Sequence, residues 1–290
     1  MFLNTLSVEN TKILKRRMLW IELGILAALI IFLYTIIYAT MQTSSEMGVG
    51  SEARQTVLEI ITWPGAILNA LSFGGGNSLG GLLAIVLIGA VTAQEYTWRT
   101  MHLWLSRGIP RPVLIAAKFV ALLLPIFLFV VTPLLLGGGL TAIFTLQIDK
   151  SLPFDQINWW HLAMSVLRTA YTLLPYATLT FMLAIVTRST AAAIGIGLAY
   201  TLLVESIAST VFPLLGGILA KIAVYLPGSL AEGVLKLNDT AMVGRLVSAG
   251  DGINTVKYLD PIPAAIGIAL WTILFLGLAV WSFRRQDMSD

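Results

Sequence analysis

Six long apolar segments constrain the fold of this chain more than any other feature. They cover about residues 19–41, 78–94, 114–142, 162–187, 190–212 and 262–283. All six fall at or above the lower limit of about 17 residues for a transmembrane helix, and residues 19–41 cross a core about 30 Å thick at about 1.5 Å per residue. Inside a bilayer the backbone polar groups have no water partner, so a helix must satisfy them internally. The sequence therefore predicts an all-α integral membrane protein with six transmembrane helices.

Composition supports this class and excludes several others. Hydrophobic residues make up 57% of the 290 residues and charged residues 11%, whereas soluble domains carry about 25% charged residues. The net charge of +3 is small, so the expected partner is the lipid bilayer and no nucleic acid. The chain has no cysteine, which excludes disulfides and thiolate metal sites.

Three segments outside the spans are also predicted to be helical. Residues 1–18 have apolar residues at rough helical spacing before a basic cluster, as in an interfacial amphipathic helix. A signal peptide is the alternative, but the apolar run that follows is too long and lacks a small-residue cleavage site. Re-entrant or interfacial helices are predicted over residues 63–73, which are interrupted by Pro64, and over parts of 213–261.

The distribution of basic residues predicts the orientation. Of the 18 Lys and Arg residues, 11 lie at the two ends, in the loops 95–110 and 188–189, or just after the first of these loops at Arg111 and Lys118. By the positive-inside rule both termini and these loops are cytoplasmic, and the 213–261 segment is extracytoplasmic. Glu22, one turn inside the first span, lies close enough to the N-terminal basic cluster to pair with it or to snorkel to the interface.

The loop between the second and third spans is unusually rich in positive charge. Plotted at 100° per residue, residues 95–110 form an amphipathic helix that stops at Gly108 and Pro110. Its faces are Trp98, Met101, Trp104 and Leu105 on one side, and Arg99, Thr100, Ser106 and Arg107 on the other. Such a helix lies on the membrane surface or binds a soluble partner.

This loop resembles the first cytoplasmic loop of ABC-2 type export permeases. The residues that carry the resemblance are Glu95-Tyr96, Trp98 to Thr100, Leu105 to Gly108, Arg111 and Lys118. Arg99-Thr100 stands where many members have Gly-Thr. The six spans and the ending Phe283 to Asp287 extend the resemblance over nearly the whole chain.

The resemblance implies a function for the loop and partners for the chain. Residues 95–110 would be the coupling helix that docks on a separate ATP-binding-cassette ATPase, which would bind ATP and Mg. Glu95 would be the acidic anchor, Trp98 and Thr100 part of the helix, and Arg99, Arg107 and Arg111 the partner-facing charges. The pathway would be a homodimer or a heterodimer with a second permease, in a prokaryotic cell membrane.

The chain lacks the residues of an enzyme. It has no phosphate-binding G-x-x-x-x-G-K-[ST] sequence, because Gly81 follows Gly80 where lysine is required. The glycines from Gly74 to Gly81 instead indicate a turn followed by close helix packing. His102 and His161 are the only histidines, and the predicted topology separates them. We therefore expect no catalytic residue, no metal and no cofactor in this chain.

Arg168 and Glu205 are ionisable residues within the fourth and fifth spans. Each lies about seven residues, or roughly 10 Å, from the same predicted interface. Since a short turn joins these spans, the residues are predicted to form an intramembrane ion pair. The alternative is a polar site that contacts substrate.

Three functions fit the sequence to different degrees. The permease subunit of an ABC exporter is the preferred interpretation. A secondary transporter would require repeated halves and polar midplane residues, and the two halves here do not match. A non-transporting membrane assembly factor is the third possibility. No residue pattern selects a substrate.

Overall fold

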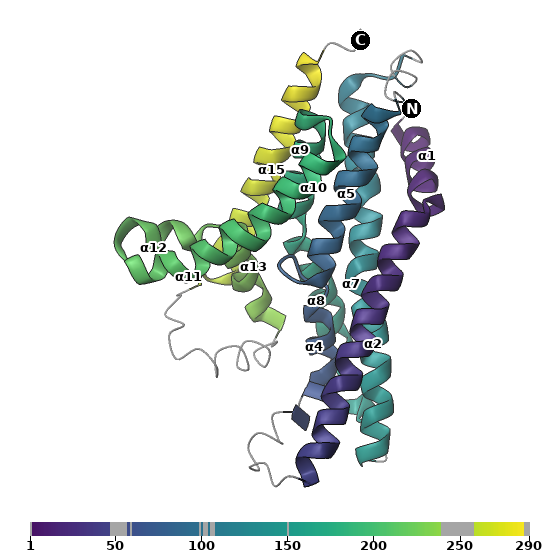
Figure 1. Ribbon diagram of the computed structural model, residues 1–290, viewed down its shortest axis with the longest axis vertical. Coiled ribbons are helices and arrows are strands. Elements are labelled where there is room, and N and C mark those ends of the chain that lie inside the picture. The colour runs from purple at the N-terminus through teal and green to yellow at the C-terminus, as the bar shows by residue number, and fades with distance from the viewer. Residues whose placement is uncertain are drawn as a thin grey trace.

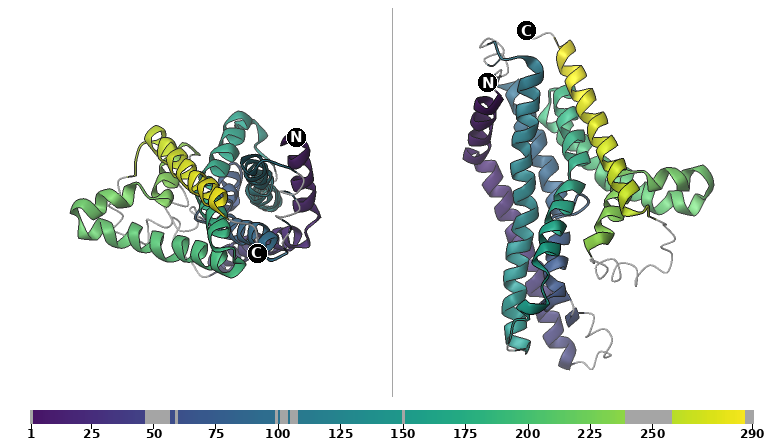
Figure 2. Two further views of the ribbon diagram at one scale, coloured as in Figure 1. Left: turned by 90° about the horizontal axis from the view of Figure 1, so that it is seen from above. Right: turned by 180° about the vertical axis from the view of Figure 1, so that it is seen from behind.

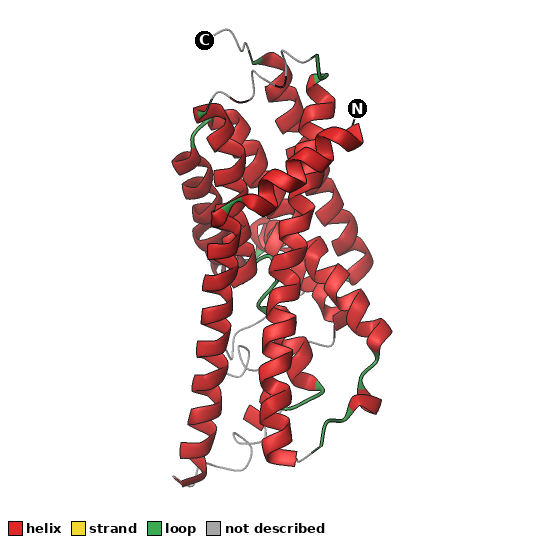
Figure 3. Cartoon of the chain, turned by 90° about the vertical axis from the view of Figure 1, so that its right-hand side faces the viewer, coloured by secondary structure: helices red, strands yellow, loops and turns green. Residues whose placement is uncertain are grey.

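The computed structural model describes residues 2–46, 57–58, 60–98, 100, 104, 108–149, 151–238 and 258–286. All regular elements in these ranges are helices, as predicted (Figure 3). They are α1 (Phe2–Lys15), α2 (Arg17–Glu46), α4 (Gly65–Ser72), α5 (Leu79–Thr97), α7 (Arg111–Asp149), η1 (Phe154–Gln156), α8 (Trp159–Thr172), α9 (Leu174–Thr187), α10 (Thr190–Ala199), η2 (Tyr200–Glu205), α11 (Ser206–Leu215), α12 (Gly217–Val224), α13 (Pro227–Leu235), η3 (Lys236–Asn238) and α15 (Pro261–Arg285).

Within the described ranges, six helical segments are long and apolar enough to cross a membrane, which confirms the predicted fold class. They are Arg17–Gln42, Leu79–Thr97, Arg111–Ile148, Trp159–Thr187, Thr190–Leu215 and Pro261–Arg285. The fourth consists of α8 and α9, which are separated at Leu173. In the fifth, the π-helix η2 joins α10 to α11. A further pair, Gly217–Val224 and Pro227–Asn238, is bent by 59°.

The helices α2, α5 and α7 run side by side and form the main bundle (Figure 1). The buried face of α2 includes Leu19, Leu26, Ile30 and Tyr34, whose spacing is that of one helical face. α7 has 39 residues, or about 58 Å of helix, and extends beyond the predicted 114–142 at both ends. It continues through Pro125 and Pro133.

α4 lies within residues 63–73, for which the sequence predicted a re-entrant or interfacial helix. Its residues Ala66, Ala70 and Leu71 are fully buried, and the helix packs against α7 inside the bundle. The chain then turns through Gly74 to Gly76 into α5. The Gly80 amide donates to the Phe73 carbonyl at 2.9 Å, and a Cβ on Gly80 would lie 2.9 Å from the Gly74 Cα. The interpretation of these glycines as a turn with close packing is confirmed.

The start of α1 and the end of α15 lie at the same end of the bundle as the end of α5 and the start of α7 (Figure 1). α11 and α12 project sideways from the bundle, as the turned views show (Figure 2). The described part of the segment after the fifth span forms α12, α13 and η3, as the sequence predicted helices there. Of the predicted coupling helix, residues 99, 101–103 and 105–107 lie outside the described residues.

Candidate functional site

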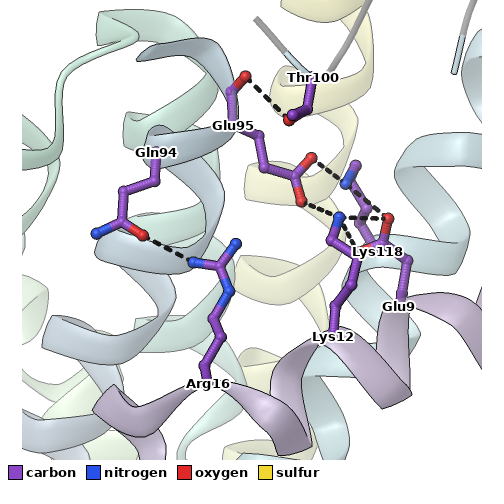
Figure 4. A network of polar contacts seen from close by, with 7 residues as sticks. All are labelled: Glu9, Lys12, Arg16, Gln94, Glu95, Thr100 and Lys118. Atoms are coloured by element: carbon purple, nitrogen blue, oxygen red, sulfur yellow. Dashed lines mark hydrogen bonds and ion pairs between the residues drawn. The ribbon is translucent and has the colours of Figure 1, made fainter. Parts of the chain in front are cut away.

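Four charged side chains from three helices meet at the end of the bundle that carries both chain ends (Figure 4). Glu9 and Lys12 come from α1, Glu95 from the last turns of α5, and Lys118 from the start of α7. The Lys118 ammonium contacts the carboxylates of both Glu9, at 2.9 Å, and Glu95. The Lys12 ammonium contacts Glu95 at 2.7 Å and Glu9 at 3.2 Å. We call these four residues the charge cluster.

The charge cluster is buried yet electrically balanced. The side chains of Glu9 and Glu95 are 3% exposed and that of Lys118 is 5% exposed, whereas that of Lys12 is 32% exposed. Buried ions are tolerated when opposite charges and hydrogen bonds replace the water they lose. Here two ammonium groups neutralise two carboxylates, and each carboxylate contacts both cations. The cluster therefore fastens α1, α5 and α7 together.

A second layer of contacts surrounds the charge cluster. Arg16, at the junction of α1 and α2, donates from Nη1 to Gln94 Oε1 at 2.8 Å. Its guanidinium lies 5.4 Å from the centre of the Trp98 ring, and the Lys12 ammonium lies 5.6 Å from that of Trp104. Burial lowers the pKa of Arg16, and Glu95 and Glu9 act in the opposite direction. An arginine remains cationic under these conditions because its ordinary pKa is so high. These contacts hold the start of the 98–110 loop against α1.

The structure places the predicted coupling residues in different surroundings. Glu95 is inside the charge cluster, while Trp98 is 61% exposed. Thr100 Oγ1 donates to the Glu95 carbonyl at 3.3 Å. Arg111, predicted to face a partner, donates instead to the carbonyls of Arg284 and Gln286, at 2.8 and 3.2 Å. Arg99 and Arg107 lie outside the described residues.

Sequence reasoning missed most of the charge cluster. It placed Lys118 at the near interface and did not link Glu9 or Lys12 with Glu95. One signal was available, since Glu9 and Lys12 are three residues apart and thus share a helix face. Their partners on α5 and α7 are 83 and 109 residues away. Such contacts depend on helix packing, which a single sequence does not reveal.

The predicted ion pair between Arg168 and Glu205 is not formed. Arg168 Nη1 donates to the Leu237 carbonyl at 2.9 Å and to Asn238 Oδ1 at 3.3 Å. Glu205 accepts from the Tyr176 hydroxyl at 2.5 Å and from the Gly228 amide at 3.1 Å. Gly228 lies in the first turn of α13, whose amides have no partner within the helix. The chain that follows the fifth span thus supplies both acceptors of Arg168 and one of the donors to Glu205.

The predicted pairing of Glu22 with the N-terminal basic cluster is also wrong. The Glu22 side chain is buried, and neither carboxylate oxygen has a hydrogen-bond partner in the part of the chain that the structure describes.

A search of the described residues finds no group of three or more His, Asp or Glu that could hold a metal ion. The groups brought together at the charge cluster already satisfy one another. They are therefore suited to holding helices in place.

Comparison with known proteins gives one family and one relative. The profile of a family described as a protein of unknown function (DUF2705) matches residues 77–289. The "Uncharacterized protein YhcI" of Bacillus subtilis (strain 168) is 26% identical over 223 residues. That match covers 73% of this chain and 66% of the relative, which is less than two thirds of the relative's length. The family match includes Glu95 and Lys118 but not α1.

Proposed function

The chain belongs to the DUF2705 family and is a multi-pass membrane protein, and on this premise we propose that it is the permease subunit of an ABC exporter. Two copies, or one copy and a second permease, form the pathway. A separate ATPase binds and hydrolyses ATP and docks on residues 95–110. In this proposal both chain ends and the 95–110 loop are cytoplasmic.

The charge cluster is the observation that carries this proposal. It lies where α5 leads into the 98–110 loop, which is the part of residues 95–110 that follows α5. A loop that receives force transmits it only if its ends are fixed to the helices that must move. α5 leads into the loop and carries Glu95, which is bound to Lys12 of α1 and to Lys118 of α7. Beyond the loop, Arg111 is bound to the end of α15. A push on the loop would therefore reach α1, α5, α7 and α15 together.

The motif supplies the second support. The loop resembles the first cytoplasmic loop of ABC-2 type export permeases at Glu95-Tyr96, Trp98 to Thr100, Leu105 to Gly108, Arg111 and Lys118. The structure adds that Trp98 is exposed at the end where the loop lies, so its ring is available to a partner. No feature of the described residues selects the exported substrate.

Partner binding tests the proposal directly. The full chain is purified with candidate ATP-binding-cassette ATPases of the same organism and reconstituted, and ATP hydrolysis with and without this subunit is compared. Replacing Trp98 and Arg107 together by alanine should leave the yield of folded protein unchanged and remove the stimulation of hydrolysis. The control replaces Trp159 and Trp160, an exposed aromatic pair at the start of α8, and should stimulate like the wild type. Wild-type stimulation by the Trp98 and Arg107 variant would refute the coupling function of the loop.

Labelling tests the proposed orientation. The chain has no cysteine, so single cysteines can be introduced at Ser51 and at Ser7, which is exposed on α1. In intact cells an impermeant maleimide should label position 51 and leave position 7 unlabelled until the membrane is permeabilised. The reverse result would invert the topology and remove the proposed docking site from the cytoplasm.

Glu22 supports a second candidate function, secondary transport driven by an ion gradient. An unpaired buried carboxyl within a membrane span is costly unless it has a function, such as carrying a proton. This candidate predicts substrate transport by proteoliposomes that contain this chain alone and an imposed proton or sodium gradient. Glu22→Gln should abolish that transport. Gradient-driven transport without an ATPase would favour this function over the exporter.

A further inference from the structure

A groove of about 500 Å3 lies between α8, the end of α13 with η3, and the start of α15. Its walls are mainly apolar and include Leu167, Leu237, Ile262 and Ile266. The Tyr171 hydroxyl, also in the wall, donates to the Ala265 carbonyl at 2.8 Å. Among the described residues that line the groove, Arg168 alone is charged. Binding sites for small molecules commonly have this size and combine apolar walls with few polar groups.

Arg168 is held in position beside the groove by neutral acceptors. Its Nη1 donates to the Leu237 carbonyl and to Asn238 Oδ1. Asn238 is fully buried, and its Nδ2 donates to Thr169 Oγ1 at 3.3 Å, which fixes the amide. Among the described residues no carboxylate lies within 4 Å of Arg168 to form an ion pair. The guanidinium has five N–H donors, so donors remain for an anion in the groove.

The groove lies beside the start of the last membrane span, which is formed by α15. Its wall contains Pro261 and Ile262, the first two residues of α15, and the polar Asp260 precedes them. Ile262 and Ile266 are exposed on the surface of this chain, as expected of side chains that face lipid. From this point α15 continues for 25 residues, about 37 Å, to the end of the bundle that holds the charge cluster. Arg168 is therefore placed near the headgroups, and the apolar walls lie beside it.

We propose that this groove binds an anionic phospholipid, with the phosphate on the Arg168 guanidinium and an acyl chain along the apolar walls. Charge complementarity selects a lipid with net negative charge, because the cation beside the groove has no carboxylate partner among the described residues. A guanidinium binds phosphate oxygens with two parallel hydrogen bonds. Basic pockets between transmembrane helices are known to take lipid headgroups. The inference is independent of the proposed ATPase partner.

Lipid titration followed by native mass spectrometry tests the inference. The purified full chain in detergent is titrated with phosphatidylglycerol and with phosphatidylcholine that has identical acyl chains. The wild type should prefer phosphatidylglycerol by about tenfold, the effect of one charge-assisted interaction. Arg168→Gln should remove this preference, and Arg168→Lys should keep part of it. Ala265→Phe, which fills the groove, should weaken the binding of both lipids.

The control is Lys221→Gln, which removes a positive charge from an exposed position on α12, outside the groove. It should bind like the wild type. Equal binding of the two lipids by the wild type, or an undiminished preference in Arg168→Gln, would overturn the inference. If Arg168→Gln does not fold, the Arg168→Lys and Ala265→Phe titrations decide. Displacement of phosphatidylglycerol by millimolar inorganic phosphate would show a soluble anion site and overturn the lipid assignment.

Discussion

Two regions of the molecule bury carboxylates by different means. Where α1, α5 and α7 meet, Glu9 and Glu95 are neutralised by Lys12 and Lys118. In the region of α10 to α13, Glu205 is buried with only neutral donors described as partners, the Tyr176 hydroxyl and the Gly228 amide. Ion pairs tie three helices into one unit, whereas the neutral bonds attach α13 to the fourth and fifth spans.

The surroundings of the two carboxylate sites also differ. The charge cluster lies against a core formed by α2, α5 and α7. Beyond Glu205 the chain continues into α11 and α12, whose apolar side chains, such as Leu214 and Ile218, are exposed. Ion pairs join the helices of the first region, whereas the second region presents apolar side chains at its surface. The following predictions test this difference, from the largest expected effect to the smallest.

Lys118→Met should cause the largest loss of stability. It leaves Glu9 and Glu95 with only the partly exposed Lys12, and breaking a buried ion pair typically costs about 3–5 kcal/mol. Unfolding in detergent, followed by circular dichroism, measures the change. Adding Glu95→Gln to Lys118→Met should restore part of the loss. The control Lys15→Met makes the same chemical change at an exposed position of α1, and equal stability of the two variants would contradict the prediction.

Glu205→Ala should destabilise the fold by less, about 1–3 kcal/mol, because it leaves the buried Tyr176 hydroxyl and Gly228 amide without an acceptor. Glu205→Gln is the matched control. Its amide oxygen can still accept one of these bonds, so its loss should be smaller. The same unfolding assay applies, and a Gln variant as unstable as the Ala variant would show that the charge itself is required.

Arg16→Gln should cost about 0.5–1 kcal/mol, since it removes a cation from the Trp98 ring near the surface. It does not touch the charge cluster, so the stabilising effect of Lys118 should be unchanged in this background. Arg17→Gln, at an exposed neighbouring position, serves as the control. A loss as large as that of Lys118→Met would mean that Arg16 belongs to the cluster energetically.

A double-mutant cycle between Arg168 and Glu205 should give the smallest effect. The two side chains have separate partners, so their effects should add to within about 0.3–0.5 kcal/mol. The cycle between Glu95 and Lys118, measured in parallel, should show strong coupling. A coupling of comparable size for Arg168 and Glu205 would show that the two side chains form an ion pair after all, and would contradict the prediction.

The sequence by itself determined the class of the protein and the positions of its spans. Each span requires about 20 apolar residues in succession, and a backbone in lipid must form a helix. Both requirements are local, so they can be read from consecutive residues. The tight turn at Gly74 to Gly81 was predictable for the same reason, because only glycine allows such a close backbone approach.

Only the tertiary structure decided which polar groups meet. Lys118 contacts Glu9, which is 109 residues away, and Arg111 donates to the Arg284 carbonyl at the end of α15. Arg168 and Glu205 are on consecutive spans, yet each is bound by the chain that follows the fifth span. These pairings depend on how each helix is rotated and on which helices pack together. Hydropathy sets the length of a span but leaves its rotation and neighbours open, because the apolar surface of a span packs against lipid or protein.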